Sequence, residues 1–151
     1  MLKIRIAVIF LFVSLVAYSQ GETNTWYFGV NAGLDFNSGE PVALIDSQMN
    51  GGEGCATISN ATGQLLFYTD GITIYNRNHQ IMQNGTGLYG HVSSTQSATI
   101  VQKPGSATLY YVFTVDINDN VIYGLRYSIV DLNLDNGLGA VTNDKNILLL
   151  D

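Results

Sequence analysis

A short internal repeat is the feature of this sequence that most narrows the folds open to it. The tetrapeptide at 55–58 (Cys-Ala-Thr-Ile) recurs at 97–100 (Ser-Ala-Thr-Ile), and a glycine turn follows each copy. Each turn leads into an aromatic segment that ends in Thr and, soon after, Asp, at 65–70 and 109–116. A period of about 40–45 residues filled with short strands is typical of a β-propeller blade. The repeat therefore predicts antiparallel meanders that form the first blades of a β-propeller.

The rest of the chain also predicts an all-β fold. Gly, Asn and Asp recur about every eight to twelve residues after residue 20, and no stretch has helical periodicity. We expect two blade-like units, about 20–92 and 93–151, with the segment 84–92 as the connector between them. Asp70-Gly71 fits a two-residue hairpin turn of the mirror-image type, in which both central residues have positive φ. A small β-sandwich is the alternative architecture.

The last of the expected strands is an apolar segment. The expected strands are 26–29, 33–36, 56–59, 64–69, 72–75, 80–82, 97–101, 109–115, 122–130 and 146–150. The last one, Asn-Ile-Leu-Leu-Leu, is not followed by a polar closing segment. Because an unpaired apolar strand associates readily with other chains, we expect this sequence to be the beginning of a longer protein.

The segment 1–19 has the three parts of a secretory signal peptide. Lys3 and Arg5 give a positive start, the segment 6–16 forms an apolar core, and small side chains precede a cleavage site between Ser19 and Gln20. The apolar core is shorter than the roughly 20 residues that a membrane-spanning helix needs. We therefore expect a secreted chain, extracellular or at the cell surface, with no membrane span after cleavage.

This expectation is tested at the N-terminus of the native protein. We expect mass spectrometry of the protein from its own cells to find Gln20 as the first residue, because signal peptidase cleaves after the small residue Ser19. A mature protein that still carries Met1, or that is recovered only from the cytosol, would contradict the prediction.

The net charge of the chain excludes some classes of partner. Cleavage removes Lys3 and Arg5 but no acidic residue, so the formal net charge changes from −6 to −8. Nucleic acids and anionic lipids bind through clustered Lys and Arg, so neither is an expected partner.

Cys55 is the only cysteine, which excludes an internal disulfide. Its repeat counterpart is Ser97, another small residue, and this favours a packed thiol over a reactive one.

Seven motifs between residues 26 and 98, each weak alone, form a specific set, and the resemblance that rests on them covers nearly all of the mature chain. They are 26–29 (WYFG), 31–36 (NAGLDF), 53–59 (EGCATIS), 66–71 (LFYTDG), 75–79 (YNRNH), 84–88 (NGTGL) and 94–98 (STQSA). This set resembles the N-terminal region of large secreted Bacteroidota proteins that are often labelled gliding-motility-associated. The resemblance implies a β-propeller region followed by PKD-like or other immunoglobulin-like modules and a C-terminal sorting domain for type IX secretion. Export beyond the periplasm follows from the resemblance alone.

One segment partly matches a calcium loop. Asp131, Asn133 and Asp135 alternate as calcium ligands do. The turn glycine comes one residue late, at Gly137, and Thr142 stands at the twelfth position, where the loop needs a bidentate Glu. A turn rich in Asx residues is therefore the favoured interpretation, with calcium as the alternative.

No motif selects a catalytic group or another cofactor. His79 and His91 have no zinc-like spacing to other ligands, and the hydroxyl-rich segment 93–97 lacks the Gly-x-Ser-x-Gly elbow of a serine hydrolase. Carboxylates such as Glu22, Glu40 and Glu53 can supply the acid/base pair of a glycosidase, but the linear pattern does not select two of them.

The sequence thus favours a non-catalytic binding or scaffold region of a secreted or cell-surface protein, linked to adhesion or gliding. The expected partners are downstream domains of the same polypeptide and surface glycans or proteins. Seven tyrosines lie in or beside expected strands, where packing between blades is the favoured role and stacking on sugar rings the alternative. The rival function is part of an extracellular polysaccharide-processing hydrolase or lyase, for which carboxylates should converge in one pocket.

Overall fold

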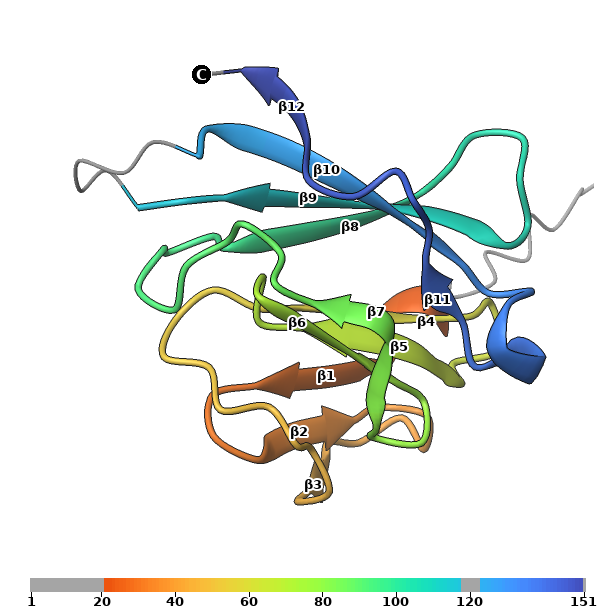
Figure 1. Ribbon diagram of the computed structural model, residues 1–151. Helices are drawn as coiled ribbons and strands as arrows, with labels where there is room; N and C mark the ends of the chain where they lie inside the picture. Colours follow the sequence, from red (N-terminus) through yellow and green to blue (C-terminus); the bar gives the residue numbers. More distant parts are fainter. Residues whose placement is uncertain (1–20, 118–122, 151) are drawn as a thin grey trace, which may run out of the picture.

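The computed structural model describes residues 21–117 and 123–150 (Figure 1). In this part of the chain there are twelve β-strands, two single-turn 3-10 helices and no α-helix. The prediction of an all-β fold built from antiparallel meanders is confirmed. The elements are η1 (Gly21–Thr23), β1 (Thr25–Phe28), β2 (Ala32–Asp35), β3 (Val42–Leu44), β4 (Ala56–Ser59), β5 (Leu65–Thr69), β6 (Thr73–Asn76), β7 (Ile81–Thr86), β8 (Ala98–Gln102), β9 (Leu109–Val115), β10 (Leu125–Asp131), η2 (Asp135–Gly137), β11 (Ala140–Val141) and β12 (Ile147–Leu150).

The strands lie in three layers (Figure 1). The antiparallel sheet β1-β2-β3 forms the lowest layer in the figure, the meander β4-β5-β6-β7 the middle layer, and the meander β8-β9-β10 with β12 the upper layer. β1 lies beside β4, and β4 lies beside β8, so the first strands of the three layers are neighbours in space. The expected unit 20–92 therefore contains two of these sheets, and its assignment to propeller blades stays a prediction.

The middle and upper layers are joined along a narrow seam. β11 pairs antiparallel with β10 on one side and parallel with β7 on the other, where Ala140 lies opposite Gln83. Side chains reinforce this seam. The Asn84 amide donates to the carbonyl of Val141 (3.1 Å), and the Lys145 ammonium donates to the carbonyl of Asn84 (3.0 Å). Because β4 and β8 are also adjacent, the nine-stranded sheet curves back on itself.

Two separate apolar cores lie on opposite faces of the middle layer. Successive strand residues point to opposite faces, so Phe67 and Tyr68 in β5 enter different cores. Phe67 belongs to the larger core, inside the curved sheet, and its ring meets that of Tyr110 edge to face at 5.6 Å between centroids. Tyr68 belongs to the smaller core, under the β1–β3 sheet, with Tyr27 and Met49.

The larger core is built by both meanders. Its buried members are Phe67, Ile74, Met82, Leu88, Tyr110, Val112, Val130 and Val141. Ile58 of β4 and Ile100 of β8, which are counterparts in the repeat, both pack against it. The repeated strands therefore present equivalent faces to each other across this core.

The turn at Asp70-Gly71 differs from the prediction. Gly71 has φ of +89°, but Asp70 is not among the residues with positive φ, so the turn is not of the mirror-image type. Strand pairing stops at Thr69 and Ile74, which leaves a longer connection than the dipeptide predicts. The Asp70 carboxylate accepts hydrogen bonds from the backbone N–H groups of Ile72 (2.9 Å) and Thr73 (2.7 Å). An aspartate that bonds the backbone after it organises a turn without positive φ of its own.

The predicted connector 84–92 is also partly wrong. β7 continues through Thr86, although Asn84 has φ of +57° and a glycine follows it. The seam explains this, because Asn84 is held from outside its own hairpin by Val141 and Lys145. A contact between residues far apart in the sequence overrides the local turn signal.

Candidate functional site

A cleft of about 640 Å³ lies at the end of the upper layer where β9 ends and β10 begins. One wall comes from the turn before β8 and from β8 itself, and the other from β9, the residues after it and the start of β10. Most of its polar lining is neutral: Ser93, Ser94, Thr95, Gln96 and Thr99, with the carboxylate of Asp116. The apolar lining is Phe113, Val115, Ile117 and Leu125.

The hydroxyl-rich wall of the cleft is fixed by hydrogen bonds. The Ser97 hydroxyl accepts from the backbone N–H of His91 (3.0 Å), and His91 Nδ1 accepts from the backbone N–H of Ser93 (3.1 Å). Gly54 donates its N–H to the carbonyl of Ser94 (3.1 Å), which ties this turn to the segment before β4. His91 is thus a turn residue, and Ser97 is fully buried behind the wall.

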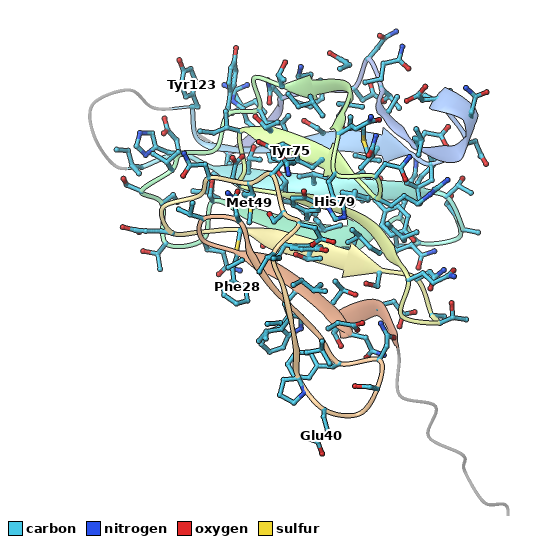
Figure 2. The ribbon with its side chains drawn as sticks, turned by 90° about the horizontal axis from the view of Figure 1, so that it is seen from below. Phe28, Glu40, Met49, Tyr75, His79 and Tyr123 are labelled. Atoms are coloured by element: carbon cyan, nitrogen blue, oxygen red, sulfur yellow. The ribbon has the colours of Figure 1, made fainter. Side chains whose placement is uncertain are left out.

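A second polar cluster connects the lower and middle layers. The Tyr27 hydroxyl donates to Asp46 Oδ1 (2.8 Å), and His79 Nε2 lies 3.3 Å from Asp46 Oδ2. On the other side of the imidazole, His79 Nδ1 lies 3.3 Å from the Tyr68 hydroxyl, which accepts from the backbone N–H of Gln48 (3.1 Å). The His79 ring lies 5.5 Å from that of Tyr27 and 5.9 Å from that of Tyr68 between centroids, and Figure 2 shows His79 in the middle of the molecule.

No sequence motif points to this cluster. Asp46 and His79 lie far apart in the chain, so only the packing of the β1–β3 sheet on β5 brings them together. An Asp–His–Tyr chain is also found in general-base sites, but Tyr68 is fully buried and Tyr27 is only 4 % exposed. The phenols are thus out of a substrate's reach, while the side chains of Asp46 and His79 are 53 % and 23 % exposed. Through its bonds to Tyr27 and Tyr68, the cluster holds segment 45–49 against the middle layer.

Burial, and next the hydrogen bond to Asp46, raise the pKa of Tyr27 well above its ordinary value of 10.0. Above about pH 10 the unfolded chain loses this proton while the folded chain keeps it, so the free energy of unfolding falls as pH rises. We expect Tyr27→Phe to make this alkaline loss of stability less steep, as urea unfolding between about pH 9 and pH 11 would measure. Tyr89→Phe, at an exposed tyrosine, is the control. Equal slopes for Tyr27→Phe and the unmodified chain would contradict the prediction.

Cys55 packs against the smaller core, beside β4. Its thiol is half-buried and unpaired, and burial raises its pKa above the ordinary value. A raised pKa lowers the fraction of thiolate, which is the nucleophilic form. The expected packing of Cys55 is therefore observed.

The calcium candidates lie in the turn between β10 and β11. Asp131 Oδ1 accepts from the backbone N–H of Asn133 (2.9 Å), and the Asn133 amide donates to the Thr108 hydroxyl (3.0 Å). Asp135 begins η2 with φ of +49°. Within residues 21–117 and 123–150, no group of three or more His, Cys, Asp or Glu side chains lies close enough to hold a metal ion. These bonds are those of an Asx-rich turn, and calcium binding stays a prediction.

The glutamates named from the sequence do not meet in one place. Glu22 lies in η1 beside β4. The pKa of Tyr110 is raised first by the burial of its own side chain and then by the negative charge of Glu22. Glu40 is exposed in the turn between β2 and β3, and Figure 2 shows it at a tip of the molecule, far from His79. Glu53 is exposed in the segment before β4. None of the three is among the residues that line the cleft.

The upper layer has a broad face that points away from the larger core, called the outer face below. Its members are Thr99, Val101, Tyr111, Phe113, Val115, Leu125 and Tyr127, which pair across β8, β9 and β10. The Tyr111 ring meets the Tyr127 ring edge to face at 5.6 Å, and Lys103 Nζ lies 5.8 Å from the Tyr111 centroid. Val101 and Val115 remain 44 % and 41 % exposed. The cleft occupies the end of this face next to the 93–96 turn, and Val101 lies toward the other end.

The outer face of the upper layer corresponds, in the repeat, to a face of the middle layer that is covered by another sheet. Thr57 of β4 and Thr99 of β8 are counterparts, and both point away from the larger core. The Thr57 hydroxyl accepts from the backbone N–H of Tyr27 in β1 (2.9 Å), so the β1–β3 sheet covers its face. Thr99 is exposed, and none of the described residues forms a corresponding sheet over it.

The signal-peptide residues Ser19 and Gln20 lie outside the described part of the chain. A search of the described residues for a helix both long and apolar enough to span a membrane finds none. Comparison with known proteins assigns no family, since no family model, curated protein or solved structure matches this chain.

Proposed function

We propose that this chain is a non-catalytic binding or scaffold region of a secreted protein, and that its outer face packs against another β-sheet. The observation that carries the proposal is the difference between the two copies of the repeat, whose corresponding faces are covered in one copy and exposed in the other. One copy of the repeat has its Thr57 face under a three-stranded sheet, and the other copy leaves the Thr99 face bare. Since the two copies present equivalent faces, we expect a second β-sheet to cover the Thr99 face as well. Burial of apolar surface is the main favourable term in such an association.

Secretion and the biological setting belong to the same proposal. The signal-peptide pattern and the resemblance to gliding-motility-associated Bacteroidota proteins support a place at the cell surface, reached through type IX secretion. In that setting the occupant of the outer face is a further β-sheet module of the polypeptide, as in a β-propeller.

In the isolated chain, a second copy can take the place of that module. Trp26 and Phe28 of β1 are exposed on the side of the β1–β3 sheet opposite to Tyr27, and the Trp26 ring lies 5.1 Å from that of Phe36. Contact between this side of one copy and the outer face of the next is head-to-tail, which builds rings or filaments rather than closed twofold dimers. β12 adds an exposed apolar edge to the upper layer, since Ile147–Leu150 pairs with β10 alone among the described strands.

The cleft favours binding over polysaccharide hydrolysis. Hydrolysis with two carboxylates requires a pair about 5–10 Å apart across the bond that breaks. Asp116 is the single carboxylate among the described residues that line the cleft. A polysaccharide hydrolase or lyase is expected to bring carboxylates together in one pocket, whereas Asp116 stands alone among the described residues of this cleft.

Sedimentation velocity over a concentration series tests the proposal. We expect the mature chain to self-associate as concentration rises, and Val101→Glu, which places a charge on the outer face, to shift it to monomer. Leu134→Glu is the matched control, because Leu134 is 42 % exposed, close to the 44 % of Val101, and lies in the turn between β10 and β11. A monomeric mature chain that melts sharply would contradict the proposal and favour a small closed β-sandwich. Equal sedimentation of the two variants would place the contact elsewhere and would also contradict it.

A further inference from the structure

The cleft at the end of β9 has the lining of a site for a neutral ligand that carries many hydroxyl groups. Its volume of about 640 Å³ lies within the range of small-molecule sites, roughly 300–1,000 Å³. The described residues that line it include one carboxylate and no Lys, Arg or His. An anionic ligand would meet Asp116 without a compensating cation, so the charge of the site disfavours phosphates, sulfates and uronic acids.

The polar residues that line the cleft offer hydrogen bonds of both kinds. Gln96 Nε2 donates to the Thr99 hydroxyl (3.3 Å), and a primary amide retains a second N–H and an acceptor oxygen for a ligand. Asp116 Oδ1 accepts from the backbone N–H of Ile117 (2.8 Å), and a carboxylate has further lone pairs on both oxygens. A ligand hydroxyl that donates to a carboxylate makes a stronger bond than one that donates to a neutral group.

The cleft also offers an aromatic surface. Phe113 lines the cleft, and its ring lies 5.8 Å from that of Tyr111 and 6.4 Å from that of Tyr127 between centroids. These neighbours keep Phe113 in place. A saccharide ring has an apolar face of C–H groups and an edge of hydroxyls, so it fits a cleft that is lined by an aromatic ring together with an amide, hydroxyls and a carboxylate.

We propose that this cleft binds a neutral saccharide, with Phe113 against the apolar face of a sugar ring and Asp116 and Gln96 accepting and donating hydrogen bonds at its hydroxyls. The wall is preorganised, because the bonds from Gly54 to Ser94 and within the 91–97 turn hold the backbone of the segment that carries the hydroxyl groups before a ligand arrives. This inference rests on the proposed binding function and names the class of ligand for it.

The test uses isothermal titration of the mature chain with four neutral probes: maltotriose, cellotriose, mannotriose and N-acetylchitotriose. We expect at least one probe to bind. Phe113→Ala and Asp116→Asn should each weaken that probe about tenfold or more, which corresponds to about 1.4 kcal/mol. Leu134→Ala is the control, since it removes an exposed apolar side chain from the turn between β10 and β11 and Leu134 does not line the cleft.

The titration is repeated with Val101→Glu, because the cleft and the proposed sheet contact share one face of the upper layer. Val101 does not line the cleft, so this variant should keep the site intact. Thr99, Phe113, Val115 and Leu125 belong both to the cleft and to the outer face, so self-association should compete with the probe. We therefore expect the variant to bind the probe at least as tightly as the unmodified chain does. Saccharide binding and sedimentation are thus measured separately, and either proposal can fail without the other.

Each other outcome overturns the assignment. Failure of all four probes to bind at millimolar concentration, in both the mature chain and Val101→Glu, would exclude a neutral saccharide. Binding unchanged in Phe113→Ala and Asp116→Asn would exclude this cleft. Tighter binding of galacturonic-acid oligomers, or of an unstructured peptide, than of any neutral probe would show that the ligand class is wrong. Circular dichroism melts of both variants within a few degrees of the unmodified chain separate loss of the site from loss of the fold.

Discussion

Gly71→Val should lower the free energy of unfolding by about 3 kcal/mol or more, for two reasons that add. A β-branched residue at φ of +89° is strained by about 1–3 kcal/mol. The new side chain also has no room, because a Cβ at position 71 would collide with the Ser97 hydroxyl and lie 2.9 Å from Ser97 Cβ. Overpacking of a buried site costs about 1–3 kcal/mol in addition.

Gly39→Val separates the two reasons. Gly39 has the same φ of +89°, and a Cβ there would have no atom within 4 Å, so this variant has the strain without the collision. Urea unfolding followed by circular dichroism should rank the unmodified chain first, Gly39→Val second and Gly71→Val third. Equal losses in the two variants would show that Ser97 moves aside without cost.

The second large effect is expected at Phe67. Phe67 is fully buried in the larger core, in contact with the Tyr110 ring, and Phe67→Ala should lower the free energy of unfolding by about 3–5 kcal/mol. The loss combines the missing transfer free energy of the ring with the cavity that it leaves. The same urea measurement applies.

Phe28→Ala is the control, because it makes the same chemical change at a residue that is 39 % exposed. We expect it to cost less than about 1 kcal/mol, the range of substitutions outside the core. Comparable losses at both positions would contradict the assignment of Phe67 to the core and of β5 to the wall of the curved sheet.

The strands of this chain could be predicted well where they pair with their neighbours in sequence. β4 and β9 have the predicted bounds, because alternation and glycine turns mark these strands. The turn at Asp70-Gly71 could not be predicted from dipeptide preference, since its form depends on the Asp70 side chain and on Ser97 in the next meander. In the same way, the end of β7 is set by Lys145 and Val141 across the seam.

The candidate site followed from the sequence only in part. The sequence singles out the hydroxyl-rich segment 93–97 only as a nucleophile candidate, which it excludes. Nothing in the sequence indicates that this segment forms the wall of a cleft. That segment reaches the same cleft as Phe113 and Asp116 because of the register of β8 with β9, which pairs Thr99 with Phe113 on one face of the upper layer. The Asp46–His79 pair had no signal at all, because the two residues come from different layers.

The narrow seam between β7 and β11 bears on the order of events during folding. Within each meander, neighbouring strands are separated by short turns, so their pairing closes small loops at a low cost in chain entropy. The seam joins Gln83 to Ala140, which are distant in the sequence, through one backbone pair and a few side-chain bonds. Contacts between distant residues form late, because their closure entropy is lost before they give stability in return. We therefore expect the two meanders to form first and the seam to close last, with the larger core left partly hydrated until Val141 docks beside Val130.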